Sequence, residues 1–283
     1  MFPYIVFFVV LVLVQSLPNQ AMSTSDVDQW GVFDDLWEQQ IGLGYLTKLA
    51  VGRSHTKDID GNHYYFVTYN PDFDIYVSKT MLETGGLWER DMLSLFLFLL
   101  HTRNDSSISP CITVDAGAHV GTFTLFAASM GCQVLSFEMQ FTSVAVVQFA
   151  LRLSGYTHRV QQYNVALWNE TGIELHWIDR LHNVGNADLF STLPGTGKPI
   201  LSQRFDDIYT RSDDIFFMKM DVEKAEEYAL QGQSVSQRRS HDISHKHLLI
   251  VNINTSSYHH LLLLIDVPIC CFLFIFVLLF SFC

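Results

Sequence analysis

The sequence predicts an α/β fold with a central, mostly parallel sheet and helices on both faces. Three observations support this prediction. Short apolar runs alternate with helix-like segments along the middle of the chain, at residues 111–115, 122–130, 133–137, 141–153 and 160–167. This strand–helix order is typical of parallel sheets, because a crossover between parallel strands has room for a helix. The first two strand-like runs lead into acids, Asp115 and Glu138, and 49% of all residues are hydrophobic, enough for a packed core.

The flanking segments follow the same kinds of pattern. Residues 63–68 and 73–78 are β-type runs separated by an Asn-Pro-Asp turn signal, which predicts a hairpin. Residues 88–101 are rich in Leu and lack Gly and Pro, which predicts a buried helix. Downstream we expect further strands at 173–178, 198–203, 215–220 and 248–253, and a helix at 225–232.

Composition excludes several classes of function. The chain has 283 residues and a formal net charge of −12, so it has no electrostatic reason to bind nucleic acid. Its five cysteines are too few and too scattered for a disulfide framework, and no Cys-x-x-Cys pair is present for structural zinc. The histidines at 241, 245, 247, 259 and 260 have serine-rich surroundings and no accompanying acid–His motif, which favours a flexible polar loop around them over a metal site.

Both ends carry apolar segments. Residues 5–14 are too short to span a bilayer comfortably, which favours a signal peptide within 1–23, and hence the secretory pathway, over an N-terminal anchor. Residues 267–283 contain no charge and could be a membrane anchor, a removable lipid-anchoring signal or sequence from a mispredicted exon. Either segment could attach the protein to a membrane. Between them we expect an extension at 24–87, the main domain at 88–255 and an apolar tail at 256–283.

The turn after the first apolar run is the most informative motif. It is Val-Asp-Ala-Gly-Ala-His-Val-Gly at 114–121, and Glu138 follows the next run. Gly117 and Gly121 allow a sharp strand-to-helix turn and a close approach of ligand to backbone, with Ala118 between them. Glu138 stands where a carboxylate can accept hydrogen bonds from ribose hydroxyls.

Two ligand classes suit this layout, and a tight turn that binds no ligand is the third alternative. A dinucleotide would place its diphosphate beside Asp115, which is electrostatically unfavourable. S-adenosylmethionine carries a sulfonium and an ammonium and has no phosphate, so an acid at the turn is favourable for it. The motif therefore favours S-adenosylmethionine over NAD as the cofactor.

A series of segments extends this motif over roughly Trp88–Gly232: VDAGAHVGTFTLFAA, LSFEMQ, NVALWNETGIEL, HNVGNADL, LSQRFDDIY and FFMKMDVEKAEEYALQG. The series resembles the FkbM family of S-adenosylmethionine-dependent methyltransferases. The resemblance implies a Rossmann-like class I methyltransferase fold and O-methylation of a small-molecule or carbohydrate acceptor. It implies that Asp221 and Glu223, which match the family's Asp-Val-Glu-Gly segment, are catalytic. The donor-binding residues would be Asp115, Gly117, Ala118, Gly121, Glu138, Asn164 and Ala166.

The chain departs from the family pattern at several positions. His119 stands where the family usually has Asn, Asp188 where Ser is common, and Lys224 where the family has the Gly of Asp-Val-Glu-Gly. The family domain continues past Gly232 with more sheet, whereas this chain continues with a His- and Ser-rich stretch. We therefore expect the C-terminal edge of the sheet to be incomplete or replaced by other strands.

Methyl transfer to an alcohol requires the acceptor oxygen about 3 Å from the sulfonium methyl, exclusion of water and a base for the hydroxyl proton. Asp221 and Glu223 follow a strand and are candidate bases; Glu226, His119 and His182 are further candidates. Two other interpretations remain open. One is a catalytically inactive, membrane-tethered binding protein that keeps the fold, and the other is a truncated gene product.

Overall fold

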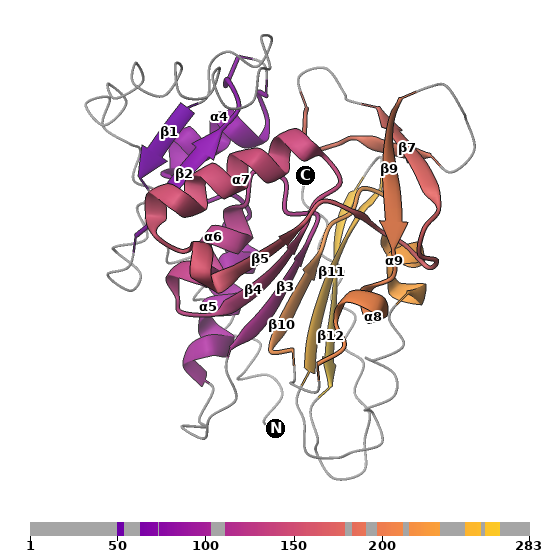
Figure 1. Cartoon of the computed structure of the whole chain (residues 1–283). Helices are drawn as coiled ribbons and strands as arrows, with labels where there is room; N and C mark the ends of the chain where they lie inside the picture. Colours follow the sequence, from indigo (N-terminus) through magenta and orange to yellow (C-terminus); the bar gives the residue numbers. More distant parts are fainter. Residues whose placement is uncertain are drawn as a thin grey trace. The chain divides into compact units, whose positions relative to one another are not determined.

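The structure is a computed structural model of the chain. It describes residues 50–53, 63–72, 74–102, 111–178, 183–190, 197–211, 215–232, 247–255 and 258–266, without the side chains of 50, 51, 53, 102, 188, 190, 247–255 and 258–266. The predicted signal peptide, the stretch at 233–246 and residues 267–283 lie outside the described residues. Within the described part, no helix is long and apolar enough to cross a membrane. The chain forms two compact units, Met1–Ile108 and Ser109–Cys283 (Figure 1).

The described residues of the first unit form a two-stranded sheet and two helices. Strand β1 (Ala50–Arg53) pairs antiparallel with β2 (Tyr65–Thr68). Helix α4 spans Val77–Thr84 and α5 spans Arg90–Thr102, and α5 confirms the helix predicted at 88–101. The largest fully buried side chains of this unit are Tyr64, Phe66, Tyr69, Met81 and Phe96.

The predicted hairpin of 63–68 and 73–78 is wrong in its second half. Residues 74–76 form a bend and turn, α4 begins at Val77, and β2 pairs with β1 instead. The Asp74 carboxylate accepts hydrogen bonds from the backbone N–H and the hydroxyl of Ser78, at 3.0 and 2.6 Å. A donor in the first helical turn is thereby satisfied, so local capping overrides the strand-like pattern.

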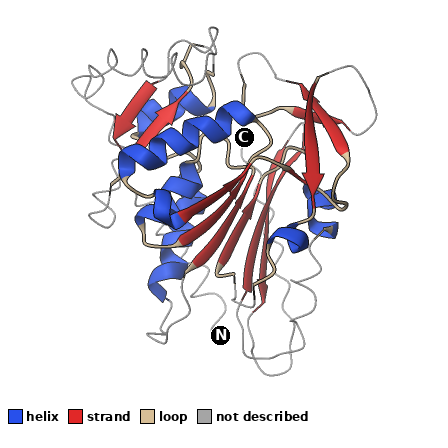
Figure 2. Ribbon diagram, in the orientation of Figure 1, coloured by secondary structure: helices blue, strands red, loops and turns tan. Residues whose placement is uncertain are grey.

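The second unit is built on a six-stranded sheet with the order β12-β11-β10-β3-β4-β5. Figure 1 labels these strands, and Figure 2 shows them in red. Its strands are β3 (Ile112–Ala116), β4 (Gln133–Phe137), β5 (Val160–Tyr163), β10 (Phe217–Met220), β11 (His247–Thr255) and β12 (Tyr258–Asp266). Neighbouring strands are parallel except for the antiparallel pair β11–β12. This is the mostly parallel sheet that the sequence predicts. Strands β11 and β12 form one edge of the sheet. Strand β12 lies wholly beyond residue 255, where we placed the end of the domain, and so falls in the predicted apolar tail.

Helices cover both faces of this sheet. On one face, helix α6 (Thr122–Ser129) contacts β3 and β4, and helix α7 (Phe141–Ser154) contacts β5. A short 3-10 helix, η3 (Thr157–Arg159), connects α7 to β5. Successive strand residues face opposite sides. Alternate residues of β3, β4 and β10 therefore form a core with α8 (Phe205–Ile208) and α9 (Glu226–Gln231) on the other face.

A smaller sheet has the order β6-β9-β7-β8. It comprises β6 (Ala166–Leu167), β7 (Glu174–Ile178), β8 (Asp188–Phe190) and β9 (Lys198–Gln203). The strands predicted at 173–178 and 198–203 are confirmed here. The single strand predicted at 160–167 is wrong, because it divides between the two sheets. The break falls at Asn164, whose side-chain amide donates to the backbone carbonyls of Glu138 and Met139, both at 2.9 Å.

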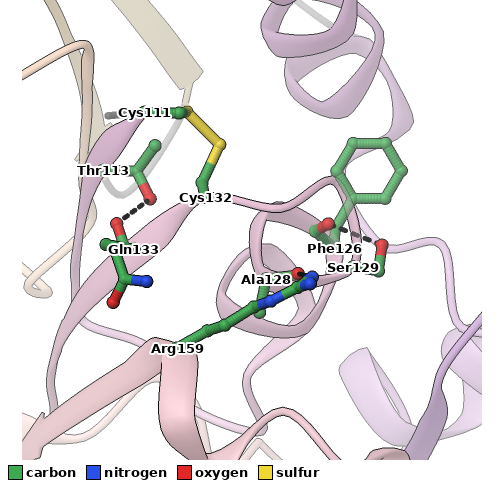
Figure 3. Close-up of a disulfide and its surroundings, with 8 residues drawn as sticks. All are labelled: Cys111, Thr113, Phe126, Ala128, Ser129, Cys132, Gln133 and Arg159. Carbon is green, nitrogen blue, oxygen red and sulfur yellow. Dashed lines mark hydrogen bonds between the residues drawn. A yellow bond between two sulfur atoms is a disulfide. The ribbon is translucent and has the colours of Figure 1, made fainter. Parts of the chain in front are cut away.

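Cys111 and Cys132 form a disulfide at the amino ends of β3 and β4 (Figure 3). Their sequence separation is 21, and Cys132 is fully buried. The backbone joins the same ends, because the Gln133 N–H donates to the Cys111 carbonyl at 2.7 Å. Nearby, the Arg159 guanidinium donates to the Ala128 carbonyl at 2.7 Å. The scattered cysteines gave no sign of this pairing, since the fold alone brings the two strand starts together.

Candidate functional site

The turn between β3 and α6 fits closely between two neighbouring strand ends. The N–H groups of Gly117 and Ala118 both donate to the Phe137 carbonyl at the end of β4, at 2.9 and 3.0 Å. Gly117 has φ +81°, and a Cβ there would lie 1.7 Å from the Asp221 carbonyl oxygen after β10. Gly121 also has φ +81° and faces Val147 of α7. Both glycines are therefore required by backbone conformation and by close packing.

Asp115 lies in a buried polar row across the α6 side of the sheet. In the strand register it stands opposite Lys219 of β10 and Ser136 of β4. Its carboxylate accepts hydrogen bonds from the N–H and the hydroxyl of Thr124 in α6, at 3.0 and 2.6 Å. The Thr124 hydroxyl also hydrogen-bonds to Ser136 at 3.1 Å. The Asp115 side chain thus ties α6 to the sheet, and it is fully buried.

Lys219 is the functional candidate that sequence reasoning missed. Its ammonium donates a hydrogen bond to the Gly117 carbonyl at 2.7 Å, and it lies 3.5 Å from Asp115 Oδ1 and 3.9 Å from Asp221 Oδ2. The side chain is only 8% exposed. The available signal was a lysine inside the apolar run Ile-Phe-Phe-Met-Lys-Met, since a buried lysine needs a partner.

Glu138 lies directly after β4, and the backbone holds its carboxylate. Oε2 accepts the N–H of His119 and Oε1 accepts the N–H of Gln140, both at 2.7 Å. Burial raises the pKa of Glu138 to about 7, although these two hydrogen bonds and the Lys219 charge lower it. The predicted ribose acid therefore stands beside the glycine turn and changes its charge near neutral pH.

The two donor-binding residues predicted on the third strand, Asn164 and Ala166, lie in different parts of the structure. Asn164 is exposed and bonds the Glu138 and Met139 carbonyls, so it lies next to the ribose acid. Ala166 is buried in β6, and its backbone pairs with Ser202 in the smaller sheet. The structure thus gathers Asn164 with the turn, while Ala166 belongs to a different sheet.

A second group of acids follows β10. The Asp221 side chain is 20% exposed, and its N–H donates to the Ala116 carbonyl at 2.9 Å. Glu226 accepts the Val222 N–H at 3.1 Å, and burial raises its pKa. Burial, followed by the charges of Asp221 and Glu226, raises the pKa of Glu223 to about 8. Glu223 is therefore largely protonated at pH 7 and can donate a hydrogen bond.

Backbone strain coincides with these two acidic groups. His119, before α6, has φ +48°, and Glu223 and Lys224, after β10, have φ +52° and +73°. Such conformations are unfavourable for residues with a side chain, by about 1–2 kcal/mol each. Such strain clusters at functional sites, and Glu89 in the first unit, with φ +51°, also shows it.

One segment of the smaller sheet's β7–β8 connection packs against the turn. The Gln140 side-chain amide donates to the Val184 carbonyl at 2.7 Å. A Cβ on Gly185 would lie 3.1 Å from the His119 ring, so the segment leaves little room beside that ring. Val184 and Gly185 therefore lie beside the residues that hold the Glu138 carboxylate.

Carboxyl groups predominate where these elements meet. The acids are Asp115, Glu138, Asp221, Glu223 and Glu226, and the positively charged Lys219 is buried among them. The arrangement suits a cationic ligand with hydroxyl groups better than a phosphate ligand. No family model matches the chain, and no curated protein matches it.

Proposed function

We propose that the protein is an S-adenosylmethionine-dependent methyltransferase of the Rossmann-like class I type, which O-methylates a small-molecule or carbohydrate acceptor. The observation that carries the proposal is the position of the Glu138 carboxylate. It is fixed by the His119 and Gln140 N–H groups beside the Gly117 turn, at the carboxyl end of a parallel sheet. Ligands of such sheets bind at this end.

The residues present fit this cofactor. Glu138 would accept hydrogen bonds from the ribose hydroxyls, and the Gly117 turn would lie against the donor. The carboxyl groups would favour its ammonium and sulfonium charges. Two polar atoms support a ligand here, because Gln140 Oε1 and Glu223 Oε2 are buried without a hydrogen-bond partner. Buried polar atoms are ordinarily satisfied, by protein or by water.

Asp221 and Glu223 would divide the acid–base work. Glu223, with its pKa raised to about 8, would be protonated at neutral pH and would orient the acceptor by donating a hydrogen bond. Asp221, whose side chain is 20% exposed, would take the proton from the acceptor hydroxyl. When bound, the cofactor supplies an electrophilic methyl group: a C–O bond forms, the C–S bond breaks and its electron pair returns to sulfur.

Calorimetric titration of the full-length protein with S-adenosylmethionine tests the proposal, with NAD as the comparison ligand. We expect binding of the former and none of the latter. Glu138→Gln should weaken binding about tenfold or more, because it removes a charged acceptor. Glu170→Gln, at an exposed acid, is the matched control and should bind as wild type does. Equal affinity of wild type and Glu138→Gln would reject the site.

A catalytically inactive binding protein is a second candidate because of one residue. Lys224 places a long, exposed side chain beside Glu223, at the position of the family's glycine. Transfer of a labelled methyl group to a panel of polyols distinguishes the two functions. Donor binding without transfer by wild type, and transfer by Lys224→Gly, would favour the inactive protein.

We propose further that the protein works in, or facing, the secretory compartment. The Cys111–Cys132 disulfide supports this location, because disulfides persist in oxidising compartments and are rare in the cytosol. The apolar run at 5–14 is consistent with the same route. Fractionation of cells that express the tagged chain, with protease protection of intact vesicles, tests it; a tag digested without detergent argues against a luminal position.

A further inference from the structure

We propose that Lys219 is a positioning residue for the donor site, which joins the β3–α6 turn to the acids after β10 through one ammonium group. The inference rests on the proposed function, which does not itself assign a role to Lys219. It starts from geometry. The Lys219 ammonium donates to the Gly117 carbonyl at 2.7 Å, across a sequence separation of 102 residues.

The same ammonium faces carboxylates from two elements. It lies 3.5 Å from Asp115 on β3 and 3.9 Å from Asp221 after β10. Its side chain is 8% exposed and that of Asp115 is fully buried. A buried charge is stable only when it is paired and hydrogen-bonded, so Lys219 must be held in this place. Its position therefore fixes the Gly117 carbonyl relative to Asp221.

The Gly117 turn needs such a clamp because of its tight fit. The glycine backbone lies so close to Asp221 that no Cβ can be accommodated. The N–H groups of Gly117 and Ala118 both donate to the Phe137 carbonyl on the β4 side. The Gly117 carbonyl faces β10 and accepts its hydrogen bond from there. Lys219 supplies that hydrogen-bond donor. An S-adenosylmethionine molecule lying on the turn would therefore contact a backbone that is held by β4 on one side and by β10 on the other.

Lys219 also sets the charge of the site. Its positive charge lowers the pKa of Glu138 and of Glu223, against the effect of burial. The charged groups that face this region are Asp115 on β3, Glu138 after β4, Asp221, Glu223 and Lys224 after β10, and Glu226 on α9. Removal of Lys219 should therefore shift the titration of Glu138 upward, and the pH dependence of donor binding with it.

The test compares full-length Lys219→Met with wild type. We expect donor affinity to fall about tenfold or more, since a charged hydrogen bond is lost. Amide hydrogen exchange of Gly117 and Ala118 should accelerate. The midpoint of donor affinity against pH should move upward. Lys198→Met is the control, because Lys198 lies over the Trp177 ring in the smaller sheet and should change none of these properties.

A second variant keeps the proposal falsifiable if Lys219→Met leaves Asp115 unpaired and fails to fold. Lys219→Met with Asp115→Asn removes both charges of the pair, so its stability should recover. We expect its Gly117 exchange to stay fast, and this readout decides the test, because Asp115 is itself a predicted donor-binding residue. Wild-type exchange in this double variant would show that Lys219 only neutralises Asp115, and would overturn the proposal.

The two proposals fail in different ways. If wild type does not bind S-adenosylmethionine, the proposed function fails. The exchange of the Gly117 and Ala118 amides and the carboxyl titration of Glu138 by NMR then still decide the role of Lys219. If wild type binds the donor while Lys219→Met shows unchanged exchange, titration and affinity, only the positioning role is refuted.

Discussion

Removal of the Cys111–Cys132 disulfide should destabilise the second unit by an amount that the loop length sets. The bond closes a loop with a sequence separation of 21. The chain-entropy relation for a loop of this length gives about 3 kcal/mol of stabilisation, because the cross-link restricts the unfolded chain. For a domain of this size, that corresponds to a fall in Tm of roughly 6–12 °C.

The assay is denaturant and thermal unfolding of the full-length protein, either oxidised or reduced, and of Cys111→Ala/Cys132→Ala. We expect the reduced wild type to lose about 3 kcal/mol of unfolding free energy. The buried position of Cys132 adds a small packing loss in the double variant. Reductant should have no further effect on the double variant, which makes that variant the control for other effects of the reagent.

Two results would refute this reasoning. One is an unchanged free energy of unfolding on reduction, which would mean that the cross-link contributes nothing to stability. The other is recovery of both cysteines as free thiols from the native protein by mass spectrometry. The second result would also remove the support that the disulfide gives to a secretory location.

Three further predictions concern the site. In a urea titration, Gly117→Ala should lower the free energy of unfolding by about 2–4 kcal/mol, because its Cβ would meet the Asp221 carbonyl. The control Gly155→Ala, at φ +75° in open space, should lower it by only about 1 kcal/mol. Lys224→Gly should raise the free energy of unfolding by about 1 kcal/mol by relieving φ +73°, whereas Lys224→Ala should not. Since the pKa of Glu138 is raised from 4.5 to about 7 in the folded protein, the folded state binds more protons. Glu138 should therefore lower the unfolding free energy by on the order of 3 kcal/mol as pH rises from about 4.5 through 7. Glu138→Gln should lose this share of the slope, while Glu223, whose pKa is raised to about 8, still contributes its own.

The elements around the turn could be predicted because their signals are local. The strand β4 (Gln133–Phe137) coincides with its predicted bounds, and β3 and α6 differ from theirs by a residue or so. The sequence pattern of these three elements is an apolar run, a glycine turn and a second apolar run. This pattern predicts them without information about distant residues. The predicted ribose acid Glu138 follows from the same local spacing, and it lies beside the turn as expected.

The features that could not be predicted depend on distant partners. Nothing near Lys219 in the sequence indicates that its ammonium meets a carbonyl 102 residues away. Cys111 pairs with Cys132 only because parallel β3 and β4 begin side by side. The strand predicted at 160–167 divides at Asn164, whose partners are backbone atoms of another loop. Local pattern carries no information about such contacts.

Two positions differ from the methyltransferase pattern that the sequence resembles, and both have an unusual backbone. His119 and Lys224 stand where that pattern has asparagine and glycine, and both have positive φ, +48° and +73°. Glycine adopts this conformation freely, and histidine, like asparagine, adopts it several-fold more often than most residues with a side chain. Lys224 is therefore the more strained of the two residues in this left-handed backbone shape. His119 retains that shape with its N–H on Glu138 and its ring beside Gly185. Strain at the turns before α6 and after β10, which border the two groups of acids, is expected where a ligand needs that backbone shape, and it supports the proposed donor-binding site over a turn that binds nothing.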